Sequence, residues 1–117
     1  MSNKTLWAAT IVLALMLLGS GGAKLAGVPQ VHQSFAVLGL PGWFGYFIGA
    51  CEVLGAIVLF IRPLSALAAA GIAVIAIGAI YYHVAHTPVA QGVPALLILL
   101  LCSYVFARRR ADLLSFG

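Results

Sequence analysis

The sequence predicts an all-α integral membrane protein, built as one antiparallel bundle of four transmembrane helices. Of its 117 residues, 64% are hydrophobic and only 7% are charged, whereas soluble domains carry roughly 25% charged residues. This leaves too little polar surface to face water, so the expected solvent is the lipid bilayer. The same composition excludes a soluble enzyme, a disordered tail and a nucleic-acid reader. Nucleic acid is therefore not an expected partner.

Charged residues divide the chain into four nearly uncharged stretches. Each is close to the roughly 20 residues that cross a hydrocarbon core about 30 Å thick. We expect helices over residues 5–24, 43–61, 63–83 and 90–107, in a single domain that spans residues 1–117. The stretches are continuously apolar rather than alternating, which argues against strands. The first is too long for an ordinary signal-peptide core, so we expect it to stay in the protein.

The longest predicted connection, residues 24–42, contains two prolines and several large apolar side chains. It is too apolar for a free linker. We expect it either to lie along the membrane surface as a short amphipathic segment or to cap the bundle.

Positive charges predict how the bundle is oriented in the cytoplasmic (inner) membrane. With a cytoplasmic N-terminus, the inner side holds Lys4, Arg62 and Arg108–Arg110, and the outer side holds Lys24 alone. Short loops with an excess of lysine and arginine stay in the cytoplasm. We therefore expect both termini in the cytoplasm and the three histidines on the outer side.

Glu52 is the most informative residue, because it lies near the middle of the predicted helix 43–61. A carboxylate at that depth costs several kcal/mol on insertion scales and usually marks function. Gly45, Gly49 and Ala56 share its helical stripe, and small residues let a neighbouring helix approach closely. We expect Glu52 to point into the bundle and to serve a ligand, a proton or an ion pair. The alternative is a carboxyl group that only holds helices together by a hydrogen bond.

Lys24 is the natural counter-charge for Glu52, and Ser20 lies one turn before it on the same face. Glu52 lies roughly 14 Å below the start of its helix, so a direct pair requires the first helix to continue through Lys24. The alternative is a lysine that extends its ammonium group to the membrane surface. The sequence leaves both open.

His83 and His86 follow Tyr82 at the outer end of the predicted helix 63–83. Histidines three residues apart can share a metal if the helix continues, but the pattern is weak, so no metal is expected and the pair stays a weak candidate. A proton-relay or ligand-contact role for His83 fits better, because imidazole titrates near neutral pH.

The order of these features resembles the DoxX-like family of small four-helix membrane proteins. The matching segments are Gly22-Ala23-Lys24-Leu25, Leu38-Gly39-Leu40-Pro41, residues 48–56 (IGACEVLGA) and residues 78–83 (GAIYYH). By analogy, Lys24, Glu52 and His83 are the polar core of the family. The family takes its name from a subunit of a membrane thiosulfate:quinone oxidoreductase, and other members are assembly factors without catalysis. The resemblance therefore leaves open whether the chain is an enzyme.

Our first functional hypothesis is a redox-associated or accessory subunit with an outward-facing polar pocket for a lipophilic ligand such as a quinone. The pocket would be formed by Ser20, Lys24, Glu52, Tyr82 and His83. The sequence has no haem, flavin or iron–sulfur motif, so redox chemistry would belong to the ligand or a partner.

The second hypothesis is a non-catalytic assembly or chaperone factor. Gly71 and Gly78, seven residues apart on the predicted helix 63–83, would then present a lipid-facing stripe to a partner membrane protein or to a second copy. A proton-coupled exporter similar to the small multidrug resistance proteins is less favoured. Their membrane glutamate lies in the first helix, whereas Glu52 lies in the second.

Overall fold

A computed structural model describes residues 3–86 and 92–113 of the chain, and its regular structure there is entirely helical. Four long helices are present: α1 (Asn3–Leu25), α3 (Phe44–Val58), α4 (Ser65–His86) and α5 (Val93–Leu113). The short helix α2 (Pro29–Val37) connects α1 to α3, and a 3-10 turn at Arg62–Leu64 precedes α4. The all-α prediction is confirmed.

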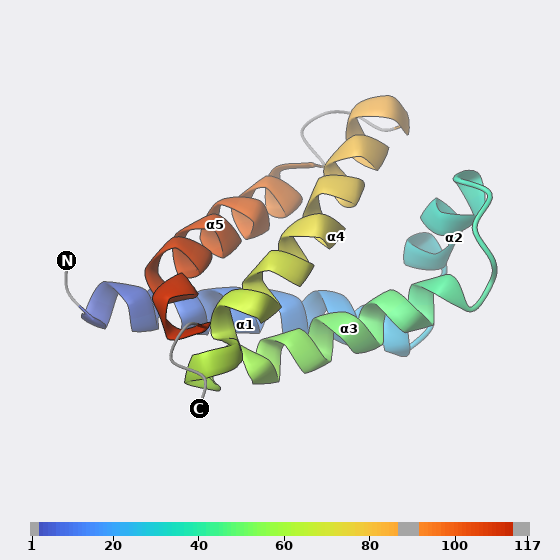
Figure 1. Ribbon diagram of the computed structural model, residues 1–117. Helices are drawn as coiled ribbons and strands as arrows, with labels where there is room; N and C mark the ends of the chain where they lie inside the picture. The colour runs from blue at the N-terminus through green and yellow to red at the C-terminus, as the bar shows by residue number, and fades with distance from the viewer. Residues whose placement is uncertain (1–2, 87–91, 114–117) are drawn as a thin grey trace.

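The long helices form two packed pairs, α1 with α3 and α4 with α5. Figure 1 shows the pairs meeting near the start of α1 and the end of α5, and spreading apart toward the other end of the molecule. The short helix α2 lies beside the start of α3 on the spread side.

A tightly packed core fills the half of the bundle where the pairs meet. Its largest fully buried side chains include Leu13 and Leu17 of α1, Leu59 just after α3, and Val105 of α5. The core therefore uses α1 from Leu6 to Leu17, and Cys102 and Val105 of α5. The opposite halves are left to form the walls of a cavity.

Two predicted helix ends near Pro63 are displaced. The helix predicted over 43–61 ends at Val58, and the helix predicted from 63 begins at Ser65. Between them, Phe60, Ile61 and Leu64 donate backbone hydrogen bonds to carbonyls three residues earlier. The cause is Pro63, which lacks an N–H and disfavours α-helical geometry in the residue before it.

Two other helices continue past their predicted ends at residues 83 and 107. α4 continues beyond 83 to His86, so His83 and His86 lie on a helix and not in a loop. α5 continues beyond 107 through Arg108–Arg110, because arginine is a good helix former. The predicted start of this helix at residue 90 lies outside the described residues.

The apolar connection between α1 and α3 caps the bundle. Its helix α2 begins with Pro29, whose missing N–H is harmless in the first turn of a helix. Gly27 and Gly39 bracket α2 with φ angles of +79° and +78°, a left-handed geometry that glycine adopts readily. Ser34 and Phe35 line the cavity, so this segment covers the bundle; its predicted position along the membrane surface stays a prediction.

The surface and length of the helices suit a membrane environment. By length and composition, two of the described helices, α1 and α4, could cross a membrane, and α3 is a shorter apolar helix. Each long helix also exposes more than half of a large aliphatic side chain: Leu15, Leu54, Val74 and Leu100.

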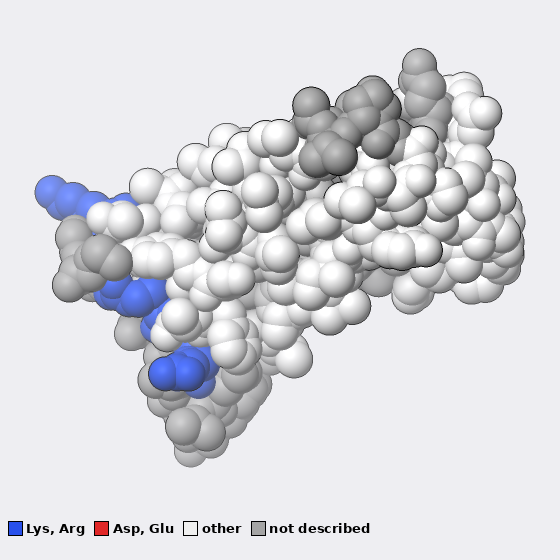
Figure 2. All heavy atoms as spheres, turned by 90° about the horizontal axis from the view of Figure 1, so that it is seen from above, with Lys and Arg blue, Asp and Glu red and all other residues white. Residues whose placement is uncertain are grey.

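Lysine and arginine side chains gather at one end of the molecule (Figure 2). This end carries Lys4 at the start of α1 and Arg108–Arg110 near the end of α5. Arg109 is mostly buried, and its guanidinium lies 5.3 Å from the ring centre of Trp7, within the range of a cation–π contact.

Candidate functional site

The site begins where α1 and α3 cross, because glycines let the two backbones approach. A Cβ on Gly49 would lie 2.7 Å from the Cβ of Lys24 and 3.0 Å from the carbonyl oxygen of Gly21. A Cβ on Gly21 would lie 2.8 Å from the carbonyl oxygen of Gly49. The predicted stripe of Gly45, Gly49, Glu52 and Ala56 is buried throughout. The backbone contact therefore turns Glu52 toward α1.

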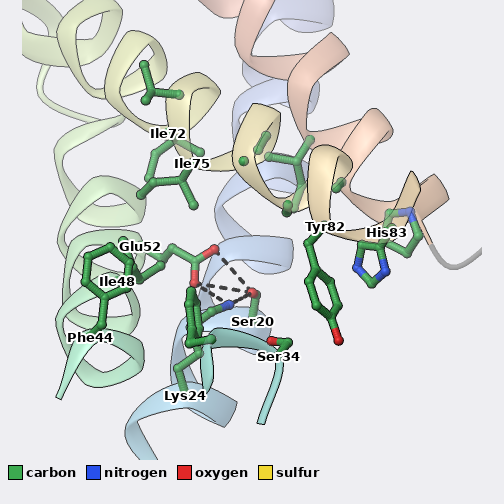
Figure 3. A pocket seen from close by; sticks show the side chains of 18 of the residues that line it. Ser20, Lys24, Ser34, Phe44, Ile48, Glu52, Ile72, Ile75, Tyr82 and His83 are labelled. Carbon is green, nitrogen blue, oxygen red and sulfur yellow. Dashed lines mark hydrogen bonds and ion pairs between the residues drawn. The ribbon is translucent and has the colours of Figure 1, made fainter. Parts of the chain in front are cut away.

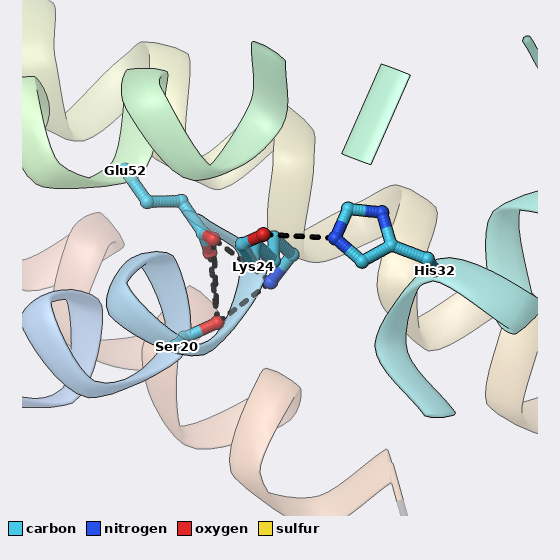
Figure 4. A network of polar contacts seen from close by, with 4 residues as sticks. All are labelled: Ser20, Lys24, His32 and Glu52. Atoms are coloured by element: carbon cyan, nitrogen blue, oxygen red, sulfur yellow. Dashed lines mark hydrogen bonds and ion pairs between the residues drawn. The ribbon is translucent and has the colours of Figure 1, made fainter. Parts of the chain in front are cut away.

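Glu52 meets Lys24 and Ser20 in a compact polar cluster, which we call the triad (Figure 4). Lys24 Nζ lies 2.8 Å from Glu52 Oε1 and donates to Ser20 Oγ at 2.8 Å. The Ser20 hydroxyl in turn faces both carboxylate oxygens, at 3.3 and 3.2 Å. The side chains of Lys24 and Glu52 are only 13% and 5% exposed, so the ion pair is largely shielded from solvent.

This geometry decides between the two positions that the sequence left open for Lys24. α1 continues through Lys24 to Leu25, and the ammonium group pairs directly with Glu52 instead of extending to the surface.

His32 of α2 joins the network, and sequence reasoning did not assign it a role. Its Nε2 lies 2.8 Å from the backbone oxygen of Lys24, and its ring lies 4.3 Å from the ring of Tyr46, centre to centre. A Cβ on Gly45 would overlap the His32 imidazole. The signal that could have found this contact is Gly45, whose place on the small-residue stripe indicates a close neighbour.

A cavity of about 860 Å³ lies beside the triad (Figure 3). All five helices contribute to its walls, which are mainly apolar; Phe35, Phe44, Ile48, Ile72 and Ile75 are among the lining residues. Ligand pockets typically have about 300–1,000 Å³ and a few convergent polar groups in an apolar lining. The cavity has the size and the chemistry of such a pocket.

The structure places all five predicted pocket residues on this cavity, in two groups. Ser20, Lys24 and Glu52 are in mutual contact, whereas Tyr82 and His83 line the wall formed by α4, apart from the triad in Figure 3. The Tyr82 ring lies 5.4 Å from the His83 ring and 5.3 Å from the His86 ring, centre to centre.

His83 and His86, the weak candidates for a metal site, have no further metal-binding side chain grouped with them among the described residues. Among residues 3–86 and 92–113, no three His, Cys, Asp or Glu side chains are grouped so that they could hold a metal ion. His86 itself is exposed.

Gly71 and Gly78 differ from the glycines of α3. A Cβ at either position would meet nothing within 4 Å, so neither glycine is needed for packing among the described residues. Both glycines are exposed; Gly78 also borders the cavity, whereas Gly71 is not among its lining residues. Seven residues apart on one helix, the two glycines share a face of α4, and the predicted stripe stays a prediction.

The sequence model of the DoxX-like family matches residues 8–106 of the chain. The chain belongs to the DoxX-like family. The match includes the triad, Tyr82 and His83, and it confirms the resemblance seen in the sequence motifs. The family is generally membrane-associated, in agreement with the apolar helices of this member. Comparisons with curated proteins and with solved structures give no match.

The triad gives this DoxX-like chain a definite chemical capability. A lysine ammonium has three hydrogens and a carboxylate has about four acceptor positions, so the pair can bind a polar group of a ligand while staying paired. The apolar walls would hold the rest of such a ligand away from water.

Proposed function

We propose that this chain is a small protein of the cytoplasmic (inner) membrane that binds a lipophilic ligand, such as a quinone, beside the Lys24–Glu52 pair. It would act as a redox-associated or accessory subunit. The observation that carries the proposal is an apolar cavity of about 860 Å³ with a buried ion pair in its wall. Glu52 would exchange a proton with the ligand, Lys24 would set its charge, and Tyr82 or His83 would donate a hydrogen bond to a carbonyl.

The proposal includes four membrane crossings with both termini in the cytoplasm. α1 and α4 have the length of a span, and the apolar stretch around α3 reaches span length with its flanking turns, residues 43–61. α5 contributes the uncharged residues 93–107 before its arginines. The basic end of Figure 2 would then face the cytoplasm, as the positive-inside rule requires.

The orientation predicts the behaviour of reporters fused to the C-terminus after Gly117. A reporter active only in the periplasm should stay inactive, and a fluorescent protein that matures only in the cytoplasm should be bright. The opposite pattern would overturn the proposed orientation but would leave the cavity in place.

A large side chain placed in the cavity should weaken binding without disturbing the triad. Ala79 lines the cavity, so we expect Ala79→Phe to weaken binding of a decyl-substituted benzoquinone by about tenfold or more, or about 1.4 kcal/mol. The matched control is Ala85→Phe, which makes the same change at an exposed position of the same helix. Binding is measured on protein in nanodiscs, by titration. Equal affinity of Ala79→Phe and the wild type would show that the quinone binds elsewhere.

A second candidate is the assembly or chaperone factor, and the open space around Gly71 favours it. A small exposed residue on a membrane helix leaves room for a partner helix, from another membrane protein or from a second copy. This candidate predicts that a larger residue at position 71 removes a co-purifying partner while the fold stays intact.

A further inference from the structure

We propose that the cavity selects uncharged amphiphiles that carry a carbonyl or hydroxyl group, and rejects both anionic and cationic amphiphiles. This inference rests on the proposed function, because it names the chemical class of the lipophilic ligand. It follows from the charge balance and the hydrogen bonding of the triad.

The charge balance comes from Lys24 and Glu52, whose opposite charges lie 2.8 Å apart in the wall of the cavity. A ligand carboxylate or sulfonate drawn to the ammonium would lie beside the Glu52 carboxylate, and a ligand ammonium drawn to Glu52 would lie beside Lys24. In an apolar cavity such like-charge contacts are poorly screened, and the ligand would also lose its hydration. A charged ligand is therefore opposed at either partner.

The hydrogen bonding favours a neutral polar group. Two contacts of the Lys24 ammonium, to Ser20 Oγ and to Glu52 Oε1, use two of its three hydrogens. The third can be donated to a ligand carbonyl. Glu52 Oε2 accepts only from the Ser20 hydroxyl among the described residues, so it can also accept from a ligand hydroxyl. Neither contact requires the ion pair to open.

The remaining walls suit the apolar part of such a ligand. Phe35 of α2, Phe44 and Ile48 of α3, and Ile75 of α4 line the cavity, and Figure 3 shows side chains of α3 and α4 around the triad. The polar head would lie against the triad and the hydrocarbon body against these residues.

The test compares three probes of similar chain length at equal mole fraction in phosphatidylcholine nanodiscs that contain the full chain. The probes are 2-tridecanone, dodecane-1-sulfonate and dodecyltrimethylammonium. Bound probe is counted by native mass spectrometry, and the shift in Tm is recorded. We expect the ketone to bind about tenfold more tightly than either ion, a difference of about 1.4 kcal/mol.

Variants that remove one charge of the triad test the inference more strictly, because each should change which probe is preferred. Glu52→Gln leaves the Lys24 ammonium without its counter-charge and should shift the preference to the sulfonate. Lys24→Met should shift it to the ammonium probe, and the double variant should restore the preference for the ketone. Lys4→Met is the matched control, since it removes one lysine from the opposite end of α1 and should leave the wild-type order unchanged.

The outcomes separate this inference from the proposed function. If no probe binds the wild type and the benzoquinone does not bind either, the proposed function fails and this inference fails with it. If all three probes bind the wild type equally, the cavity stands and the selectivity is wrong. If a variant does not fold, the order of the three probes on the wild type decides alone.

Discussion

Replacing Lys24 by methionine should lower the free energy of unfolding by roughly 3–5 kcal/mol, the typical cost of removing one partner of a buried ion pair. The physical reason is the environment of Glu52, which is only 4% exposed. Without Lys24, its carboxylate would keep the Ser20 hydroxyl as its hydrogen-bond partner among the described residues. Stability can be measured by denaturant titration of the protein in mixed micelles, with helicity as the signal.

The double variant Lys24→Met with Glu52→Leu should recover most of this loss, because buried ion pairs can often be replaced by apolar residues of similar volume at little cost. A double-mutant cycle then isolates the coupling between the two positions. Lys4→Met serves as the control; Lys4 is exposed, and losing a surface contact should change stability by less than about 1 kcal/mol. If Lys24→Met costs less than about 1 kcal/mol, the pair behaves as an exposed one, and its burial has no energetic consequence.

The inward orientation of Glu52 could be predicted from the sequence, because it depends only on helical periodicity. A stripe of Gly45, Gly49 and Ala56 beside a carboxylate indicates a close helix neighbour whatever the rest of the fold does. The same holds for the four long helices, whose apolar runs are a local property of the chain.

The Lys24–Glu52 contact could not be decided from the sequence, because helical rise locates Glu52 only relative to the start of its own helix. In the structure, Lys24 lies level with Gly49, only three residues from Glu52, as the close approach of the two positions shows. The first turns of α3 extend past the end of α1 and are covered by α2 instead. How far two helices overlap is a property of the tertiary structure, and local sequence patterns do not determine it.

The cavity and the role of His32 were also beyond the sequence. The cavity exists because the two helix pairs meet at one end and spread at the other (Figure 1), which depends on side-chain volumes summed over the whole bundle. His32 reaches the carbonyl oxygen of Lys24 only because turns at Gly27 and Gly39 place α2 against the ends of α1 and α3. Neither the cavity nor the His32 contact produces a periodic pattern in the sequence.

Gly49→Val should strongly destabilise the interface between α1 and α3, and it should also disrupt the site. The new Cβ would lie 2.7 Å from the Cβ of Lys24 and 3.0 Å from the Gly21 carbonyl oxygen, so α1 and α3 must separate. Overpacking of this kind typically costs about 1–3 kcal/mol and occasionally more. We expect about 3 kcal/mol here, because one of the clashing atoms is backbone and the separation also pulls Lys24 from Glu52.

The matched control for Gly49→Val is Gly71→Val, where the new Cβ meets nothing within 4 Å. Valine has a higher helix propensity than glycine, so this variant should keep or slightly raise the free energy of unfolding and should bind the benzoquinone like the wild type. Loss of a co-purifying protein from Gly71→Val alone would favour the assembly factor over the ligand-binding subunit. If Gly49→Val instead folds with wild-type stability and retains benzoquinone binding, the close crossing of α1 and α3 does not hold the site together, and the triad must form by another route.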